Sequence, residues 1–551
     1  MTPLKRFKNL IEIDKKDIYQ IFLYSILAGV ISLSLPLGIQ SIVNFLQAGK
    51  VSTSWIVLVI MVVIGVAFVG TLKIMQYRIT ENLQQKIFVR SSFEFAYRFP
   101  KIKFNQLYNS SAPELANRFF DTLTVQKGFS KLLLDISGAI LQILFGIILL
   151  SLYHSFFIFF GIILLSLLYF IFKINFLAGL ETSLKESKYK YRVAHWIQEI
   201  ARNHLSFKSK SVFEFSLRKN DKIVTKYLQQ RENHFTILRR QFIQLTGFKV
   251  LITAGLLIVG GVLVLNQQMN IGQFVAAEII ILSIITAVEK LFSGLELFYD
   301  VLTSLEKLGT VVDMEIETEK SNPNYQLNDD KLIIETNNVC FKFPDSEFPV
   351  LQNINLKIEP NDCILIQGKN GSGKTTLLRI LSKLLEPTAG NVFVNDVNYK
   401  KFTTEDYQSK IGIITVNDTL FEGTILENIT CKNQKITNQK LSEVLDKLDL
   451  TNYIKSLPAG FDTRIYAEGK QINSSIIQKI LLARCIINDP KILFLEEPLE
   501  KVDPVQASKI IDYLTNKAHD WTLVVISNHS YWETKSNKKI VLEKGEIISK
   551  K

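Results

Sequence analysis

The residues best suited to chemistry lie in one glycine-rich stretch in the second half of the 551-residue chain. They are Gly368, Lys369, Asn370, Gly371, Ser372, Gly373, Lys374, Thr375 and Thr376. The apolar run 363–366 precedes the stretch, and the periodic apolar segment 377–381 follows it. In a strand, glycine-rich turn and helix, backbone N–H groups and a helix N-terminus surround a phosphate. We therefore expect a bound nucleotide, with Lys374 reaching the β- and γ-phosphates and the Thr375 hydroxyl holding Mg²⁺.

The composition of the rest of the chain indicates a membrane protein. Hydrophobic residues make up 47% of the chain, its mean hydropathy is +0.18, and its apolar residues concentrate in the first 300 positions. Six runs are long enough to cross a bilayer, near residues 18–46, 55–75, 132–153, 155–174, 248–266 and 271–296. The net charge of +12 suits a membrane protein, because cytoplasmic loops are enriched in Lys and Arg. We expect a lipid bilayer as partner, and no nucleic acid.

The gaps between these runs alternate in length and charge. Residues 76–131 and 175–246 are long, polar and rich in Lys and Arg, whereas the other gaps are short. The positive-inside rule then places the long segments and both chain ends in the cytoplasm. Because the long segments contain few glycines and regularly spaced apolar residues, we expect them to extend the spanning helices as two helical hairpins. Residues 1–17 are predicted to form a basic amphipathic arm at the membrane surface.

One carboxylate, Glu278, lies inside the sixth predicted span. In the functional interpretation, this carboxylate lines a cargo path or accepts a proton within the membrane. In the alternative, it lies about two turns from the outer end of the span and faces a wet cavity without a specific role. The sequence leaves both open.

After the spans, residues 311–330 are polar, contain Pro323 and predict a linker. Residues 331–551 alternate short β-type runs with helical stretches, which predicts an α/β domain with a largely parallel sheet. All four cysteines lie in this domain, widely spaced and without a CxxC pair, so we expect thiols in a reducing compartment. The predicted fold is an all-α six-helix transmembrane domain, residues 18–310, followed by an α/β P-loop NTPase domain.

This organisation resembles one half of an ABC exporter over almost the whole chain. The motifs that carry the resemblance occur in the family's order, at residues 338–343, 384–390, 420–429, 457–463 and 492–497. The resemblance implies that Phe343 stacks on the adenine of ATP, that Glu497 is the catalytic glutamate, and that Asp503 is the D-loop aspartate. Residues 113–118 look like a coupling helix. The type I secretion and peptide-exporting branch looks nearest, but no peptidase domain precedes the spans, so we expect no leader-peptide cleavage by this chain.

Two binding segments depart from the family's pattern. In the segment that the family writes LSGGQ, Asn473 replaces the serine that meets the γ-phosphate, and both glycines are serines, the second being Ser475. An asparagine still donates hydrogen bonds, whereas serines approach phosphate less closely than glycines. Asn417 stands where the Q-loop has the glutamine that helps to hold the metal.

Two catalytic positions also depart. Glu496 replaces the aspartate that steadies the Mg²⁺ shell, and its extra methylene is expected to displace the metal's water. Asn528 occupies the position of the switch histidine, with His529 one place later. A one-residue slip would bring His529 into the site instead.

The resemblance predicts ATP-driven export across the inner membrane by a dimer. The second half-transporter is an identical chain or a better-conserved partner, and the cargo is a peptide, a protein or a lipid-like molecule. A periplasmic adaptor protein and an outer-membrane channel are further expected partners. The alternative is a subunit that binds ATP without hydrolysing it and regulates or scaffolds a transport complex.

Overall fold

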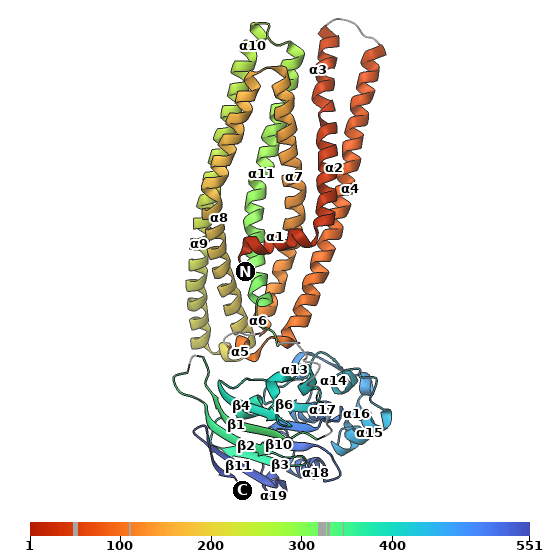
Figure 1. Ribbon diagram of the computed structural model, residues 1–551, viewed down its shortest axis with the longest axis vertical. Coiled ribbons are helices and arrows are strands. Elements are labelled where there is room, and N and C mark those ends of the chain that lie inside the picture. The colour runs from red at the N-terminus through yellow and green to blue at the C-terminus, as the bar shows by residue number, and fades with distance from the viewer. Residues whose placement is uncertain (48–52, 109–111, 318–326, 328–330, 345, 551) are drawn as a thin grey trace. The chain divides into compact units, whose positions relative to one another are not determined.

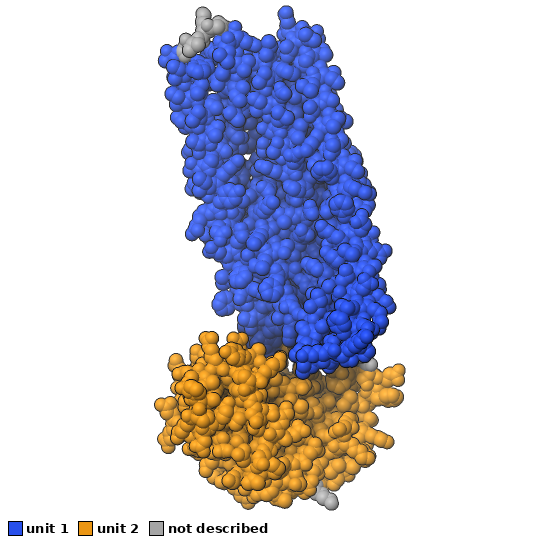
Figure 2. Space-filling model, turned by 180° about the vertical axis from the view of Figure 1, so that it is seen from behind, with its two compact units in different colours: residues 1–101, 109–314 blue, residues 102–108, 315–551 orange. Residues whose placement is uncertain are grey.

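The computed structural model describes residues 1–47, 53–108, 112–317, 327, 331–344 and 346–550. Two compact units result: residues 1–101 with 109–314, and residues 102–108 with 315–551 (Figures 1 and 2). Most of the predicted linker and most of the short gap after the first span lie outside the described residues.

The first unit is helical, and most of its mass lies in long helices (Figure 1). Its α-helices are α1 (Pro3–Ile13), α2 (Lys15–Ser32), α3 (Ser34–Gln47), α4 (Thr53–Arg98), α6 (Ala112–Ala116), α7 (Asp121–Tyr153), α8 (Phe156–Arg202), α9 (Lys210–Gly255), α10 (Gly261–Leu265) and α11 (Ile271–Val312). By length and composition, six described helical segments can cross a membrane. The predicted order of six spans and then an α/β domain is therefore confirmed.

The long helices exceed the thickness of a bilayer. Helix α8 has 47 residues, which at 1.5 Å per residue is about 70 Å, against a hydrocarbon core of about 30 Å. Helices α8 and α9 are joined by residues 203–209 and pack along each other. This agrees with spanning helices that continue as hairpins outside the hydrocarbon.

Glu278 lies in the first turns of α11 and is half-buried. Among the described residues it has no hydrogen-bond or ion-pair partner. Both interpretations of this carboxylate stay open.

The described residues of the second unit contain two larger sheets and a two-stranded sheet of β7 with β8. A six-stranded sheet has the order β12-β11-β3-β10-β9-β6, and every neighbouring pair in it is parallel except β11 with β12. A separate antiparallel sheet has the order β2-β1-β4-β5, which the sequence did not distinguish from the first. The strands are β1 (Ile334–Phe341), β2 (Leu351–Ile358), β3 (Cys363–Gly368), β4 (Ala389–Val394), β5 (Val397–Asn398), β6 (Ile411–Ile414), β7 (Gly423–Thr424), β8 (Arg464–Ile465), β9 (Ile492–Glu496), β10 (Thr522–Ile526), β11 (Lys538–Glu543) and β12 (Glu546–Lys550).

Helices cover the parallel sheet on both faces. They are α12 (Lys374–Leu381), α13 (Thr404–Gln408), α14 (Ile425–Thr430), α15 (Asn438–Lys447), α16 (Thr451–Ser456), α17 (Ser474–Ile486), α18 (Pro504–Leu514) and α19 (Tyr531–Lys535). Along β3, Ile364 and Ile366 belong to one buried cluster and Leu365 to another. Since successive strand residues point to opposite faces, the sheet is buried on both faces. A ligand can therefore reach the sheet only at the ends of its strands.

One short segment lies outside the division that the sequence suggested. The sequence placed residues 102–108, which include α5 (Phe104–Leu107), with the membrane-spanning part. In the structure they belong to the second unit, because Ile102 pairs with Ile316 in a β-bridge and the Lys103 N–H donates to the Glu315 carbonyl at 3.0 Å. Hydropathy could not reveal this placement, since it arises from backbone pairing between distant segments.

Candidate nucleotide-binding and catalytic site

Three separate segments meet at the carboxyl edge of the parallel sheet. In the strand register, Ile366 of β3 lies beside Ile526 of β10, which lies beside Glu496 of β9. The glycine-rich loop follows β3, Glu497 follows β9, and Asn528 follows β10. The carboxyl edge of such a sheet is where α/β proteins bind ligands.

The glycine-rich loop has the backbone expected of a phosphate cradle. Gly373 has φ +99°, and a Cβ built there would lie 2.9 Å from the Val350 carbonyl oxygen, so no side chain fits. The ammonium of Lys374, the first residue of α12, donates to the carbonyls of Gly368 at 2.7 Å and Lys369 at 3.1 Å. The Ser372 hydroxyl is buried and has no partner among the described residues. A cation, a free hydroxyl and a helix N-terminus therefore share one loop, which fits a polyphosphate.

The remaining loop residues frame this cradle. Lys369, Asn370 and Gly371 are exposed at its tip, and Thr376 is buried in the first turn of α12.

The candidate metal ligands Thr375 and Glu496 are already in contact. The Thr375 hydroxyl donates a short hydrogen bond to Glu496 Oε1, and the Val416 N–H donates to Glu496 Oε2 at 3.4 Å. Glu496 is only 5% exposed. Such oxygens suit Mg²⁺, which takes one or two protein oxygens together with phosphates and water. Asn417 is exposed in the adjoining turn, and the contact with Glu496 comes from the backbone of Val416.

Glu497 is held in an unusual backbone conformation beside Asn528. Its φ is +45°, the left-handed region that non-glycine residues rarely adopt. Its carboxylate accepts hydrogen bonds from the Asn528 side-chain amide at 2.9 Å and from the Asn528 N–H at 3.3 Å. Burial raises the pKa of the Glu497 carboxyl, and the hydrogen bond from the Asn528 backbone opposes this shift. The result is an oriented carboxylate with raised proton affinity, as a general base or water-orienting group requires.

His529 is directed elsewhere. Its Nδ1 accepts a hydrogen bond from the Tyr531 N–H at 3.3 Å, and its own N–H donates to the Ser527 hydroxyl. The structure thus brings Asn528, and not His529, to Glu497.

The altered LSGGQ segment begins helix α17. Asn473 is the N-cap: its side-chain oxygen accepts from the Ser475 N–H at 3.0 Å and from the Ser475 hydroxyl at 3.2 Å. Because the oxygen of Asn473 is used in this cap, its exposed NH₂ group is the part available to an incoming phosphate.

Asp503 is the N-cap of α18. It accepts from the N–H groups of Val505 and Gln506 at 3.0 and 3.3 Å. The predicted D-loop aspartate therefore has a local structural role in the single chain.

Sequence reasoning missed a residue that supports the catalytic loop. Gln478 of α17 donates to the Glu497 carbonyl at 3.2 Å and accepts from the Lys501 N–H at 2.8 Å. The amide thus ties the loop after β9 to the helix that begins at the LSGGQ segment. In the sequence, only the position of Gln478 just after the altered LSGGQ segment could have indicated this role.

Phe343, the predicted adenine platform, lies just after β1. Its ring meets Phe341 edge-on, with centroids 4.9 Å apart and an interplanar angle of 88°. Tyr108 stacks on Phe343 with centroids 4.7 Å apart and an angle of 19°. Nothing in the local sequence around Tyr108 indicated this neighbour.

The fold and the site define a P-loop α/β nucleotide-binding unit joined to a six-helix membrane unit. Residues 351–500 match the profile of the ABC transporter family. Proteins of Staphylococcus aureus strains COL and N315, described as multidrug export ATP-binding/permease proteins, are 29% identical over 215 residues. This match spans 39% of the present chain and 37% of those relatives.

The structure of a bacterial Atm1-family ABC exporter with ATP bound has the same fold. It matches with a TM-score of 0.85 at 16% sequence identity, over 98% of this chain and 96% of that one. Residues 351–500 thus match the ABC transporter family, and the chain has the fold of an ABC exporter, with six helical segments long and apolar enough to cross a membrane ahead of the nucleotide-binding unit.

Proposed function

We propose that this chain binds ATP with Mg²⁺ and hydrolyses it to drive export across the inner (plasma) membrane. The observation that carries the proposal is the pairing of Glu497 with Asn528 at the same sheet edge as the glycine-rich loop. A nucleotide-binding loop alone would support binding, whereas a half-buried, oriented carboxylate beside it supports water activation.

We assign the roles from the contacts described above together with the family resemblance. The residues 368–376 hold the phosphates, Lys374 neutralises the β- and γ-phosphates, and Phe343 stacks the base. When bound, Mg²⁺ supplies charge neutralisation at the phosphate oxygens, and Thr375, Glu496 and Asn417 are the residues proposed to hold it. Glu497 orients the attacking water and accepts its proton. Asn528 holds that carboxylate by donating a hydrogen bond and, because an amide does not titrate near neutral pH, it neither takes up nor releases a proton.

The acting unit is proposed to be a dimer. Asn473 and the N-terminus of α17 are exposed, which supports their meeting the nucleotide held by a second half-transporter; Asp503 would face that interface too. Because Ser475 replaces a glycine, the site completed by this segment is expected to turn over slowly. An identical chain or a better-conserved second half completes the pair.

The membrane part is proposed to carry the cargo, with both chain ends in the cytoplasm. Residues 1–17 are proposed as the surface arm, 18–310 as the transmembrane domain, 311–330 as the linker and 331–551 as the ATP-binding domain. A peptide, a protein or a lipid-like molecule is the proposed cargo, and the names of the staphylococcal relatives add drug-like compounds. A type I secretion role would add a periplasmic adaptor and an outer-membrane channel.

A second candidate function has its own support. Glu496 already engages the Thr375 hydroxyl, and Asn528 lacks the titratable ring of the family's histidine. Both changes favour a subunit that binds ATP without hydrolysing it and regulates a partner.

Phosphate release from ATP by the purified chain in proteoliposomes, with and without Mg²⁺, distinguishes the two functions. Mg²⁺-dependent release supports the transport ATPase. Bound ATP without release supports the regulatory subunit, and absence of ATP binding contradicts both.

A further inference from the structure

The segment 102–108 is firmly attached to the ATP-binding unit. Besides the β-bridge to Ile316, the Lys103 ammonium lies 3.1 Å from the Glu315 carboxylate, and the Ile102 side chain is 4% exposed. The Arg379 guanidinium, from the helix that follows the glycine-rich loop, lies 5.0 Å from the centre of the Phe104 ring. Tyr108 is thus carried by a segment anchored to the nucleotide-binding fold itself.

Tyr108 covers one flat face of Phe343, the ring that the proposed function assigns to the adenine. The contact with Phe341 is T-shaped, so Phe341 does not stack on Phe343, and Tyr108 is the ring that lies nearly parallel to it. Two near-parallel rings with a 19° interplanar angle already have the orientation of a stack that can receive a third ring. Tyr108 is also half exposed, at 50%, so it is not fixed by burial on all sides.

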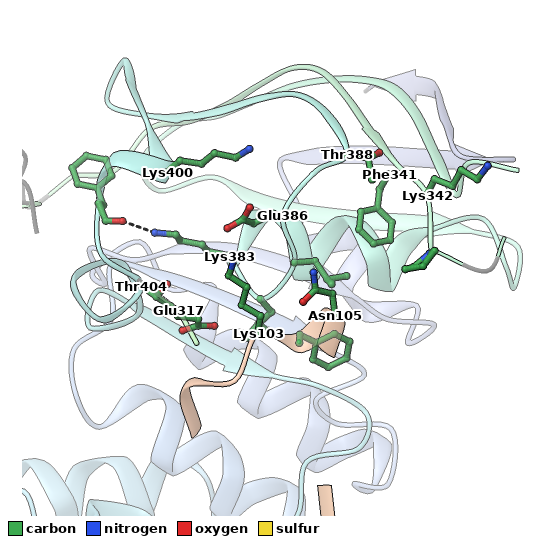
Figure 3. A pocket seen from close by; sticks show the side chains of 15 residues that line it. Lys103, Asn105, Glu317, Phe341, Lys342, Lys383, Glu386, Thr388, Lys400 and Thr404 are labelled. Carbon is green, nitrogen blue, oxygen red and sulfur yellow. Dashed lines mark hydrogen bonds between the residues drawn. The ribbon is translucent and has the colours of Figure 1, made fainter. Parts of the chain in front are cut away.

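A cavity of about 350 Å³ is lined by chain neighbours of both Tyr108 and Phe343 (Figure 3). Lys103, Phe104 and Asn105 of the segment contribute to its wall, together with Phe341, Lys342 and Pro344 from either side of Phe343. Because the cavity borders the segment of Tyr108 and the Tyr108 ring is half exposed, Tyr108 can move away from Phe343 without breaking a packed core.

We propose that Tyr108 is the second aromatic wall of the base site, and that the nucleobase enters between Tyr108 and Phe343. This inference rests on the proposed binding of ATP. An inserted base needs about 3.5 Å on each side, so its entry pushes residues 102–108 away from Phe343. Since this segment follows α4 in the chain, base binding acts directly on the chain that leads to a membrane-crossing helix.

If the base is sandwiched by two rings, the contribution of Tyr108 to binding affinity should depend on the base of the ligand and not on its phosphates. Stacking depends on the π-face that every base has and favours larger rings, so ATP and GTP should gain more than pyrimidine triphosphates. Inorganic tripolyphosphate, which has no base, should gain nothing from Tyr108.

The test uses the full chain in lipid nanodiscs and compares the binding of ATP with that of tripolyphosphate. Tyr108→Ala should weaken ATP binding about tenfold and leave tripolyphosphate binding unchanged, whereas Tyr108→Phe should stay within about twofold of the wild type for both ligands. Phe461→Ala is the matched control, because Phe461 is exposed in the same unit and has no ring contact among the described residues. Tyr108→Trp keeps a stacking ring, and its fluorescence should be quenched by ATP but not by tripolyphosphate.

Equal or tighter ATP binding by Tyr108→Ala, or equal losses for both ligands, would overturn the inference while leaving the proposed function intact. Failure of the wild type to bind ATP would instead overturn the proposed function, and this inference with it.

Discussion

The two sides of the candidate ATP site differ in how closely they keep the chemistry of an ABC ATPase. On the phosphate side, the loop 368–376 contains every residue type that the motif requires, and its backbone leaves no room for a side chain at Gly373. On the catalytic side, Glu496 and Asn528 both differ from the family's residues. Phosphate binding by the loop and hydrolysis are therefore assigned to separate groups, and the substitutions at Glu496 and Asn528 fall on the groups proposed for hydrolysis.

The contacts on the catalytic side are compatible with an oriented Glu497 carboxylate. The Asn528 amide donates to the Glu497 carboxylate at 2.9 Å. It can therefore orient the carboxylate, but unlike a histidine it cannot accept a proton from it. Glu496 accommodates its extra methylene by bonding to Thr375 and the Val416 backbone. We expect the Glu497 carboxylate to remain oriented toward the attacking water, and the transfer of the water's proton to be impaired.

The largest effect is expected on the phosphate side. Lys374→Ala removes the ammonium that reaches the phosphates and should weaken ATP binding about 100-fold, since hydrogen bonds to charged groups are worth about 1.5–3 kcal/mol each. Equilibrium binding of labelled ATP measures this loss. Lys400→Ala, which removes an exposed lysine of the same unit, is the control and should bind normally. Near-normal binding by Lys374→Ala would show that the loop does not hold the nucleotide.

On the catalytic side, the expected change is a gain. Asn528→His introduces a group that can accept and release a proton near neutral pH. It should raise the rate of ATP hydrolysis about tenfold, less than the roughly 100-fold or more typical of a positioned general acid or base, because Asn528 already orients Glu497. Steady-state phosphate release measures it, with His529→Asn as the matched control, because His529 bonds to the Tyr531 N–H and not to Glu497. A loss of rate in Asn528→His, or a large loss in the control, would show that the structure pairs the wrong residue with Glu497.

The pH dependence of hydrolysis reports the environment of Glu497. Burial raises the pKa of this carboxyl, and only the deprotonated form accepts a proton. Activity should therefore be lost, as the pH falls, at a higher pH than the value of about 4.3 of an ordinary glutamate. Asn528→Ala removes a hydrogen bond that favours the charged form, so it should move this loss to a still higher pH. An acid limb at or below the ordinary glutamate value, with ATP binding unchanged, would contradict the assignment.

The smallest effect is expected at Gln478, which connects helix α17 to the loop after β9. Gln478→Ala removes two hydrogen bonds to the loop after β9 and should lower the free energy of unfolding of the ATP-binding unit by about 1–2 kcal/mol, with a several-fold slower hydrolysis. Thermal unfolding followed beside phosphate release measures both. Gln471→Ala, at an exposed residue with a single hydrogen bond to the Arg464 carbonyl, is the control. If both variants lose equal stability and equal activity, Gln478 does not stabilise the loop after β9.

The sequence predicted the parts of the site that are local. Glycines, a lysine and a threonine between a strand and a helix define their own geometry, and the spans follow from uninterrupted apolar runs. The choice between Asn528 and His529 required the register of β10 against β9, because both residues lie in one loop. Tyr108 could not be found beside Phe343, since the contact depends on how residues 102–108 pair with residues 315–316.

The most direct test of the account is ATP hydrolysis by the purified chain in lipid beside its Glu497→Gln variant, with ATP binding measured for both. Glutamine keeps the shape of the side chain but cannot accept the proton of the attacking water. We predict slow Mg²⁺-dependent turnover by the wild type, a loss of about 100-fold or more in the variant, and equal ATP binding by the two. Turnover that is equal in both proteins, or absent from the wild type while ATP still binds, would contradict the assignment of Glu497 as the catalytic group.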